Sequence, residues 1–393
     1  MYDFDELTER RGSGCVKWDS PVTTHPSPVT LHPSPDLIPL WVADMDFKAA
    51  PAIQEAIRKR AEHGVFGYTH VGDDYYDAII SWYERRHKWS VRREWVLYTT
   101  GVVPAVSAVL KALTMPGDRV ITFTPAYNCF YSSIRNTGCE LAECQLQWNR
   151  NSRFEIPWDE FEALCRDERT SVLLLCNPHN PMGRVWSIAE LRRITSICHR
   201  NRVRMVSDEI HCELIMPDNR FTPLGSVARD AITLSSPSKS FNIAGLQIAN
   251  IICCDDETRQ RIDRAVNINE VCDVNPFGPV ALIAAYNESE AWLDELNQYL
   301  WDNYRALREF AAEHLPQWQV RPLQGTYLVW VDITRTGMSA QQYADLLLSE
   351  ARVWVNPGTM YGQVSGEGYI RLNIACPRAR LMEAMERIGE VRS

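Results

Sequence analysis

The sequence predicts an α/β protein, in which a large domain with a mostly parallel mixed sheet covered by helices is joined to a smaller α+β domain. Two observations lead to this prediction. From about residue 95, short runs rich in Val, Ile and Leu alternate with helical stretches, a pattern typical of a sheet that is buried on both faces. Beyond about residue 285, one long amphipathic helix is followed by three strand-like runs.

Six short runs, each bounded by proline or polar residues, are the predicted strands of the large domain. They are WVLYTTG (95–101), RVITFTP (119–125), TSVLLLCNP (170–178), RVRMVSDEI (202–210), AITLSSPSK (231–239) and LQIANIICC (246–254). The apolar spacing of PAVSAVLKALTM (104–115) predicts a helix after the first run. In the smaller domain the predicted elements are the long helix (288–315), GTYLVWVDI (325–333), RVWVNPG (352–358) and GYIRLNIA (368–375).

These patterns divide the chain into an N-terminal arm at 1–47, a large domain at 48–285 and a small C-terminal domain at 286–393. Residues 21–40 of the arm contain six prolines and a doubled HPSP at 25–28 and 32–35. Two copies of four residues build no core, so we expect an extended segment rather than a repeat architecture. We expect the arm to pack with the small domain.

Composition excludes several classes of protein. The net charge of −9 argues against a nucleic-acid or anionic-membrane partner. No apolar run approaches the roughly 18 residues of a membrane span, and the N-terminus lacks the apolar core of a secretory signal. The twelve cysteines are scattered without a C-x-x-C pair, which favours reduced thiols in a cytoplasmic protein over disulfides or a metal site.

Residues that can do chemistry follow five predicted strands, at the carboxyl ends where open α/β sheets bind ligands. Each signal is weak alone. Most glycine turns into helices bind no phosphate, a tyrosine is commonly half-buried, Asn-Pro steps are common in loops, and SDEIH is also typical of a solvated turn or of paired acids for hydrolysis. The residues are Gly101, Tyr127, Asn180, Asp208 with His211, and Lys239 with Ser236 and Ser238.

Together these residue types match the needs of pyridoxal phosphate. A lysine amine condenses with its aldehyde as a Schiff base, and a carboxylate keeps its ring nitrogen protonated so that the ring accepts electrons. An amide can hydrogen-bond the ring hydroxyl, and helix-start N–H groups and serines can bind the phosphate. The sequence therefore predicts a pyridoxal-phosphate enzyme with Lys239 as its covalent attachment point.

The chain also resembles the fold-type-I pyridoxal-phosphate enzymes of the class I/II aminotransferase superfamily, and more closely the MalY/PatB group of cystathionine β-lyases, or C–S lyases. The resemblance covers nearly the whole chain, and SDEIH with SPSKSFNIAGLQ is its strongest signature. The motifs are VKWD (16–19), WVADMDF (41–47), GVFGYTHVGDDYYDAI (64–79), NPHNPMGRVW (177–186), SDEIH (207–211), SPSKSFNIAGLQ (236–247), NEVCDVNPFG (269–278) and GYIRLN (368–373).

The resemblance implies a role for each residue of the site. Lys239 would also be the catalytic base, and Tyr127 would stack on the ring and could protonate the leaving sulfur. Arg371 would bind the substrate α-carboxylate, a task that suits the bidentate guanidinium fork. The other contacts to the cofactor would come from Asp208, Asn180, His211, Gly101, Val102, Val103, Ser236 and Ser238. Tyr68 would reach the phosphate and substrate of the neighbouring subunit, which implies a homodimer; Asn180 would also touch substrate.

Two positions depart from the broad aminotransferase pattern. Gln247 stands where aminotransferases usually place an arginine on the phosphate, as it also does in the C–S lyase group. His211 stands where they often place a tyrosine on the ring oxygen. A neutral glutamine forgoes a charge pair with the phosphate, so we expect somewhat looser cofactor binding.

The resemblance favours α,β-elimination of an S-substituted cysteine to a thiol, pyruvate and ammonia. A thiolate, whose conjugate acid has a pKa of about 8.5, departs readily. Two alternatives stay open: an aminotransferase, which needs a keto-acid acceptor, and a partner-binding regulatory protein on the same scaffold. Cystathionine, S-alkyl cysteines, cystine, cysteine sulfoxide conjugates and thiohistidine precursors all fit the chemistry, so the sequence leaves the substrate open.

Overall fold

The computed structural model describes residues 2–20, 22–23, 30–31, 36–149, 153–269 and 273–391. The doubled HPSP segments lie outside the described residues, as do 11 of the 20 residues of the predicted extended segment 21–40.

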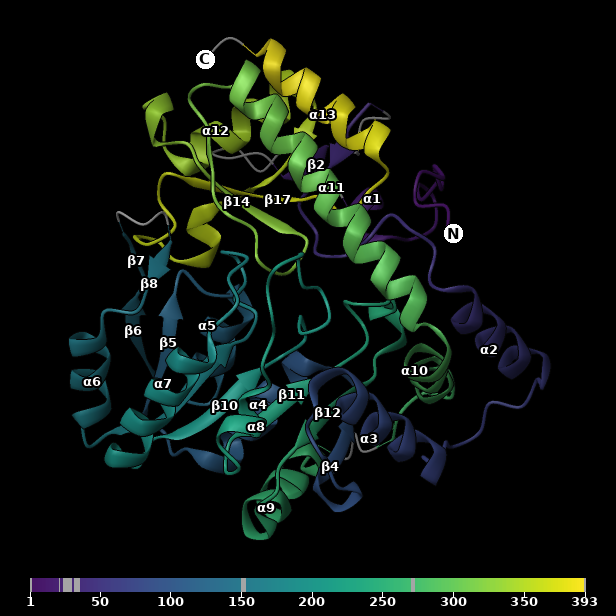
Figure 1. Cartoon of the computed structure of the whole chain (residues 1–393), viewed down its shortest axis with the longest axis vertical. Helices are drawn as coiled ribbons and strands as arrows, with labels where there is room; N and C mark the ends of the chain where they lie inside the picture. Colours follow the sequence, from purple (N-terminus) through teal and green to yellow (C-terminus); the bar gives the residue numbers. More distant parts are fainter. Residues whose placement is uncertain are drawn as a thin grey trace.

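A seven-stranded sheet forms the centre of the larger part of the molecule (Figure 1). Its strands lie in the order β4-β12-β11-β10-β9-β5-β6. All pairs from β11 to β6 are parallel, whereas β12 runs antiparallel to both of its neighbours. The strands are β4 (Val96–Thr99), β5 (Arg119–Thr124), β6 (Glu140–Gln145), β9 (Thr170–Cys176), β10 (Arg204–Asp208), β11 (Ile232–Ser235) and β12 (Ala249–Ile252). The predicted α/β fold with a mostly parallel sheet is confirmed.

The six predicted runs each contain one strand, and the seventh, β6, has no counterpart in the prediction. Its sequence ELAECQ is mostly polar, and only Ala142 and Cys144 are buried. Because β6 pairs with β5 alone, it is an edge strand that needs no continuous apolar run.

Side chains on the two faces of the sheet contribute to two separate cores. Leu173 and Leu175 of β9 pack with α6, α7 and α8, whereas Val172 and Leu174 pack with α4, α5 and α9. Both faces are therefore apolar, which explains the continuous runs of Val, Ile and Leu in the sequence. These helices are α4 (Val102–Leu113), α5 (Asn128–Asn136), α6 (Trp158–Arg166), α7 (Ile188–Asn201), α8 (Leu224–Val227) and α9 (Asp256–Asn267).

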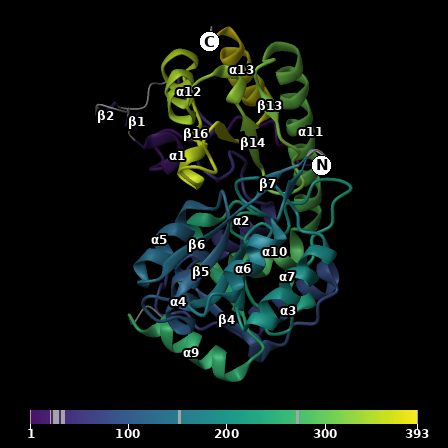
Figure 2. The same cartoon turned by 90° about the vertical axis from the view of Figure 1, so that its left-hand side faces the viewer.

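A second, antiparallel sheet in the order β13-β14-β17-β16 forms the smaller part of the molecule. The predicted long helix is α11, which extends from the large part to the small part (Figure 1), and α11, α12 and α13 gather around the small sheet (Figure 2). The elements are α10 (Phe277–Glu288), α11 (Glu290–His314), β13 (Gln319–Val320), β14 (Leu328–Asp332), η3 (Thr334–Thr336), α12 (Ala340–Leu346), η4 (Leu347–Ala351), β15 (Val353–Trp354), β16 (Asn356–Pro357), η5 (Gly358–Tyr361), β17 (Tyr369–Asn373) and α13 (Arg378–Glu390).

The remaining elements lie mostly near the N-terminus. They are α1 (Val16–Asp19), β1 (Val22–Thr23), β2 (Thr30–Leu31), β3 (Ile38–Pro39), α2 (Pro51–Glu62), α3 (Asp73–His87), η1 (Arg93–Trp95), β7 (Gln147–Trp148), β8 (Phe154–Glu155) and η2 (Ala244–Leu246). β3 pairs in parallel with β15 of the small part. The domain limits at 47/48 and 285/286 stay a prediction.

Residues 41–46, which we call the strap, follow β3 and are fixed by buried charges. The carboxylate of Asp46 accepts hydrogen bonds from Lys17 Nζ at 2.9 Å, Trp18 Nε1 at 2.8 Å and Arg10 Nη1 at 2.7 Å. Arg10 Nη2 also lies 2.7 Å from the carboxylate of Asp44. Burial alone would raise the pKa of Asp46, but the charge of Lys17 and these hydrogen bonds outweigh it and hold that pKa below its usual range.

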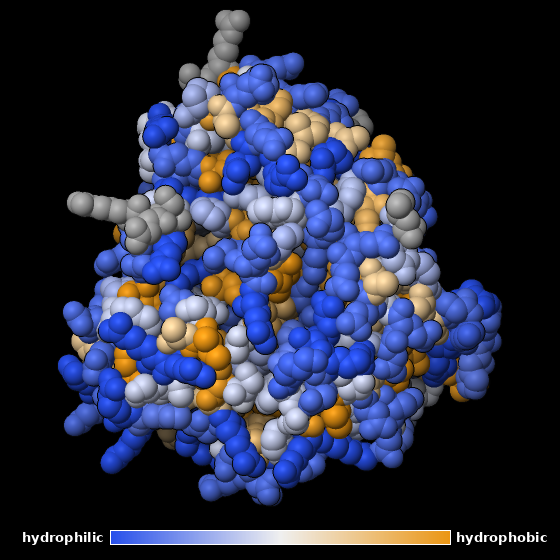
Figure 3. All heavy atoms as spheres, in the orientation of Figure 1, coloured by the Kyte–Doolittle hydropathy of each residue, from blue (hydrophilic) through white to orange (hydrophobic). Residues whose placement is uncertain are grey.

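The surface shown in Figure 3 is mostly hydrophilic, with hydrophobic residues in small scattered groups. Among the described residues, no helix combines the length and the apolar character that crossing a bilayer requires.

Replacing Asp46 with asparagine should lower the free energy of unfolding at neutral pH by about 3 kcal/mol, because it strips the buried Lys17 ammonium of its closest carboxylate. Urea unfolding of the full chain measures this. The lowered pKa means that the contribution is complete above about pH 4 and lost as the pH falls through the folded-state value. Glu55→Gln, which removes only exposed pairs, is the control; equal effects of the two variants would contradict the prediction.

Candidate active site

Five predicted strands bring their loops to one edge of the large sheet, because β4, β5, β9, β10 and β11 all run in the same direction. A cavity of about 190 Å³ lies there. Nine of the predicted site residues line it: Gly101, Val102, Val103, Tyr127, Asn180, Asp208, His211, Ser238 and Lys239. The sequence therefore located the cavity, while the individual roles stay predictions.

Lys239 follows β11, and its amine donates a hydrogen bond to the carbonyl of Ala43 in the strap at 2.6 Å. Burial lowers the pKa of this amine, and the positive charge of Arg371 lowers it further, although the carboxylates of Asp44 and Asp208 oppose the shift. A lysine with a lowered pKa can present a neutral, nucleophilic amine near neutral pH.

Asp208 is the last residue of β10 and is 3% exposed. Its Oδ1 accepts a hydrogen bond from the backbone N–H of Ile210 at 3.0 Å. Burial raises the pKa of the carboxyl to about 7, although Ile210 and the charge of Lys239 act in the opposite direction. A cationic group bound in the cavity would pair with this carboxylate, lower its pKa and so favour its ionised form.

The N-terminus of α4 supplies an anion site at the cavity. Gly101 precedes the helix with extended backbone, and Val102 and Val103 form its first turn. The first N–H groups of a helix have no partner inside it and carry the positive end of its dipole, so they bind phosphate readily. Ser238 lines the same cavity, whereas Ser236 is not one of its lining residues and its hydroxyl donates to the carbonyl of Ile248 at 2.6 Å.

Arg371 in β17 is hydrogen-bonded to Asn180, which lines the cavity. Its Nη1 donates to Asn180 Oδ1 at 3.1 Å and its Nη2 donates to the carbonyl of Trp41 at 2.9 Å. The guanidinium lies 4.6 Å from the ring centroid of Tyr361. Its Nε is buried without a partner among the described residues. Because Asn180 Oδ1 is engaged, Nδ2 is the end of that amide available to a ligand.

His211 and Tyr127 are both neutral at ordinary pH. Burial lowers the pKa of His211 to about 3, and the charges of Lys239 and Arg371 add to this effect. Its Nδ1 is buried without a partner in the described part of the chain, and its ring meets Tyr327 edge to face. Burial raises the pKa of Tyr127, so its phenol stays protonated and can donate a proton.

Tyr68 lies outside this cavity, in the segment that follows α2, and is 98% exposed. Gln247 is also exposed.

Two groups that contact Lys239 or its hydrogen-bond partner were not predicted from the sequence. They are the backbone carbonyl of Ala43 and the hydroxyl of Tyr327, which donates to that carbonyl at 2.9 Å. WVADMDF was noticed as a motif, but nothing in it indicated which atom faces the lysine.

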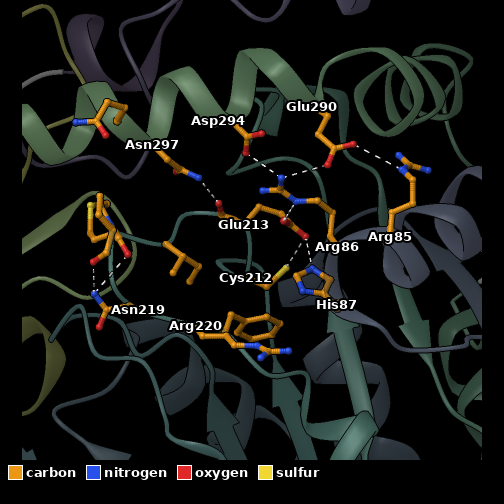
Figure 4. A pocket seen from close by; sticks show the side chains of 15 residues that line it. Arg85, Arg86, His87, Cys212, Glu213, Asn219, Arg220, Glu290, Asp294 and Asn297 are labelled. Atoms are coloured by element: carbon orange, nitrogen blue, oxygen red, sulfur yellow. Dashed lines mark hydrogen bonds and ion pairs between the residues drawn. The ribbon is translucent and has the colours of Figure 1, made fainter.

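A second cavity, of about 490 Å³, lies beside α3 and α11 (Figure 4). His87, Cys212 and Glu213 direct potential metal-ligand atoms toward one another there. The carboxylate of Glu213 accepts from His87 Nε2 at 2.6 Å and Trp82 Nε1 at 2.7 Å, and Arg86 lies 3.6 Å away. These donors occupy the carboxylate, so we assign the cluster to an ion-pair network between α3 and the loop after β10.

Asp208→Asn should stabilise the cofactor-free protein at pH 8 by about 4 kcal/mol. Because the pKa of Asp208 is raised to about 7, its contribution to stability is complete below its ordinary value near 3.8 and is lost as the pH rises through 7. Urea unfolding at several pH values between 4 and 8 measures the difference between the two proteins. Glu209, whose pKa burial raises to about 8, acts in both of them. Parallel stability curves would contradict the prediction.

The cavity fits pyridoxal phosphate on observations of this chain alone. It combines a lysine with a lowered pKa, a buried carboxyl that forms no salt bridge with any described residue, and the first N–H groups of a helix. Buried His211 Nδ1 and Arg371 Nε have no partner among the described residues. An aldehyde, a protonatable ring nitrogen and a phosphate would satisfy the first three of these groups.

Comparisons with known proteins agree with this geometry. Residues 35–388 match the family model described as aminotransferase class I and II. The chain is 36% identical to cystathionine beta-lyase PatB of Bacillus subtilis over 98% of both chains. Cystalysin of Treponema denticola, whose structure contains pyridoxal 5'-phosphate, superposes with a TM-score of 0.94 at 32% identity, covering 99% of this chain and 98% of that one. The pyridoxal-phosphate-bound C–S lyase of Staphylococcus hominis superposes with a TM-score of 0.89 at 31% identity, with the same coverage. The chain belongs to the class I and II aminotransferase family.

Proposed function

We propose that the protein is a pyridoxal-phosphate-dependent C–S lyase of the cystathionine β-lyase type, which cleaves an S-substituted cysteine to a thiol, pyruvate and ammonia. One observation carries this proposal. Lys239 and Asp208 line one cavity, and Arg371 donates a hydrogen bond to Asn180, which also lines it. The similarity over the full chain to a cystathionine beta-lyase and to C–S lyases supports the lyase reaction.

Lys239 would hold the cofactor covalently, and Asp208 would pair with its ring nitrogen. Val102 and Val103 at the start of α4, with Ser238, would hold the phosphate. When bound, pyridoxal phosphate supplies an electron sink for negative charge at the substrate's Cα. The buried carboxyl of Asp208 favours this because its ionised form requires a cationic partner.

The residues of the chain divide the remaining work. Arg371 binds the substrate carboxylate with its guanidinium, and that contact orients the Cα–H bond. Lys239, freed from the cofactor, removes the Cα proton as a neutral amine. The Cβ–S bond then breaks, the electron pair leaves with sulfur, and the phenol of Tyr127 can supply the proton that makes it a neutral thiol. Water hydrolyses the remaining three-carbon fragment to pyruvate and ammonia.

The proposal includes a homodimer in which Tyr68 enters the partner's site. Tyr68, Val65 and Phe66 lie in one segment and are 98%, 64% and 56% exposed, an unusual concentration of large apolar side chains at the surface. A cytoplasmic location fits the described cysteines, which are all free thiols.

The lyase reaction is tested by following pyruvate from L-cystathionine with added pyridoxal phosphate and no keto acid. We expect sustained release from the wild type and a loss of at least about a thousandfold in Lys239→Ala, because the variant lacks both the covalent attachment and the base. If pyruvate forms from no S-substituted cysteine and turnover requires a keto-acid acceptor, the protein is an aminotransferase.

The role of Tyr68 is tested by mixing two inactive variants, Tyr68→Ala and Lys239→Ala, under conditions in which subunits exchange. If Tyr68 serves the partner's site, each mixed dimer contains one intact site, and activity should return to about a quarter of the wild type. If Tyr68 acts within its own chain, both sites of a mixed dimer remain defective and no activity returns.

A further inference from the structure

The carbonyl of Ala43 receives two hydrogen bonds at the cavity. Lys239 Nζ donates to it at 2.6 Å, and the hydroxyl of Tyr327 donates to it at 2.9 Å. Tyr327 is completely buried and directly precedes β14. Ala43 lies in the strap, far from both donors in sequence, so this contact joins three separate segments of the chain.

The position of this carbonyl is fixed on both sides. Two residues before Ala43, the carbonyl of Trp41 accepts hydrogen bonds from Asn356 Nδ2 and Arg371 Nη2, each at 2.9 Å. The following carbonyl of Asp44 accepts from Asn373 Nδ2 at 2.6 Å. The strap is thus held by side chains of β16 and β17, and the Ala43 oxygen is a preorganised acceptor rather than part of a mobile loop.

We propose that the Ala43 carbonyl holds the amine of Lys239 whenever this amine is not bonded to the cofactor, and that Tyr327 is the positioning residue that sets how strongly it does so. The inference deepens the proposed function, because it assigns the groups that prepare Lys239 for removing the Cα proton. It concerns a contact of the cofactor-free chain and can therefore be tested without any lyase reaction.

The chemistry follows from the two lone pairs of a carbonyl oxygen. The Ala43 oxygen takes one N–H of Lys239, which orients the amine and leaves its nitrogen lone pair free for a proton. Tyr327 occupies the same oxygen as a second donor and weakens its capacity to stabilise a fully charged ammonium. The arrangement holds the lysine in place while it favours the neutral amine.

The other groups that act on this amine come from four elements. Asp44 of the strap, Asp208 of β10 and Cys129 of α5 favour its charged form, whereas burial and Arg371 of β17 disfavour it. None of them changes when the hydroxyl of Tyr327 is removed, so Tyr327→Phe isolates the proposed effect.

The test is competitive acetylation of cofactor-free, full-length protein with acetic anhydride between pH 7 and 11, with the Lys239 peptide quantified by mass spectrometry. Tyr327→Phe should lower the acetylation rate of Lys239 by about threefold to tenfold below its titration midpoint and leave the high-pH limit unchanged. Replacing Tyr327 with 3-fluorotyrosine, a stronger donor of similar size, should raise the rate below the midpoint.

Tyr304→Phe is the matched control, because Tyr304 is also buried and its hydroxyl also donates to a backbone carbonyl, that of Arg321 at 3.1 Å. It should leave Lys239 unchanged. With cofactor and substrate, only Tyr327→Phe should move the acidic limb of the kcat profile to higher pH. An equal change in both variants, or a lower rate at every pH without a shifted midpoint, would overturn the proposal and show that Tyr327 acts by packing alone. Labelling uses no substrate, so a failed lyase assay leaves this result standing.

Discussion

The common direction of β4, β5, β9, β10 and β11 is the constraint on which the rest of the structure depends. Helices cover both faces of this sheet, so a ligand can approach only at an edge. Parallel strands bring all their carboxyl ends to the same edge, and residues far apart in sequence then line one cavity of about 190 Å³. Asp208 and Lys239 both line this cavity because Asp208 is the last residue of β10 and Lys239 lies in the loop that follows β11. The backbone topology, rather than any single interaction, assembles the chemistry.

The small part of the molecule holds the strap in place, and the strap in turn contacts Lys239. Arg371 and Asn373 of β17 and Asn356 of β16 donate hydrogen bonds to the strap carbonyls of Trp41 and Asp44. Burying Asp46 and Lys17 carries a desolvation cost, which their contact and the hydrogen bonds from Trp18 and Arg10 offset. One chain segment thereby links the group expected to bind the substrate carboxylate to the group expected to remove the Cα proton.

Sequence reasoning predicted the fold class and most of the cavity because both depend on local signals. Asp208 and Lys239 each follow an apolar run, and the alternation of such runs with helices indicates the sheet. It missed β6, because an edge strand needs no continuous apolar run. It also missed the Ala43 carbonyl, because every residue has a backbone carbonyl and the residue type does not show which one accepts a hydrogen bond. The contact of Ser236 with Ile248 depends on loop geometry, and the role of Tyr68 on a second chain, so neither could be settled from residue order.

The electrostatics of the cavity show why the cofactor and the protein are complementary. Burial raises the pKa of Asp208 and lowers that of Lys239, so the chain alone disfavours the charged form of both. A ligand with a protonatable ring nitrogen would supply a cation for the buried carboxyl of Asp208, and its aldehyde would react with the amine of Lys239, whose pKa is lowered. Its phosphate would accept hydrogen bonds from the first N–H groups of α4. The desolvation of Asp208 and Lys239 would therefore favour binding of the cofactor, and the lowered pKa of Lys239 would suit its proposed role as a base.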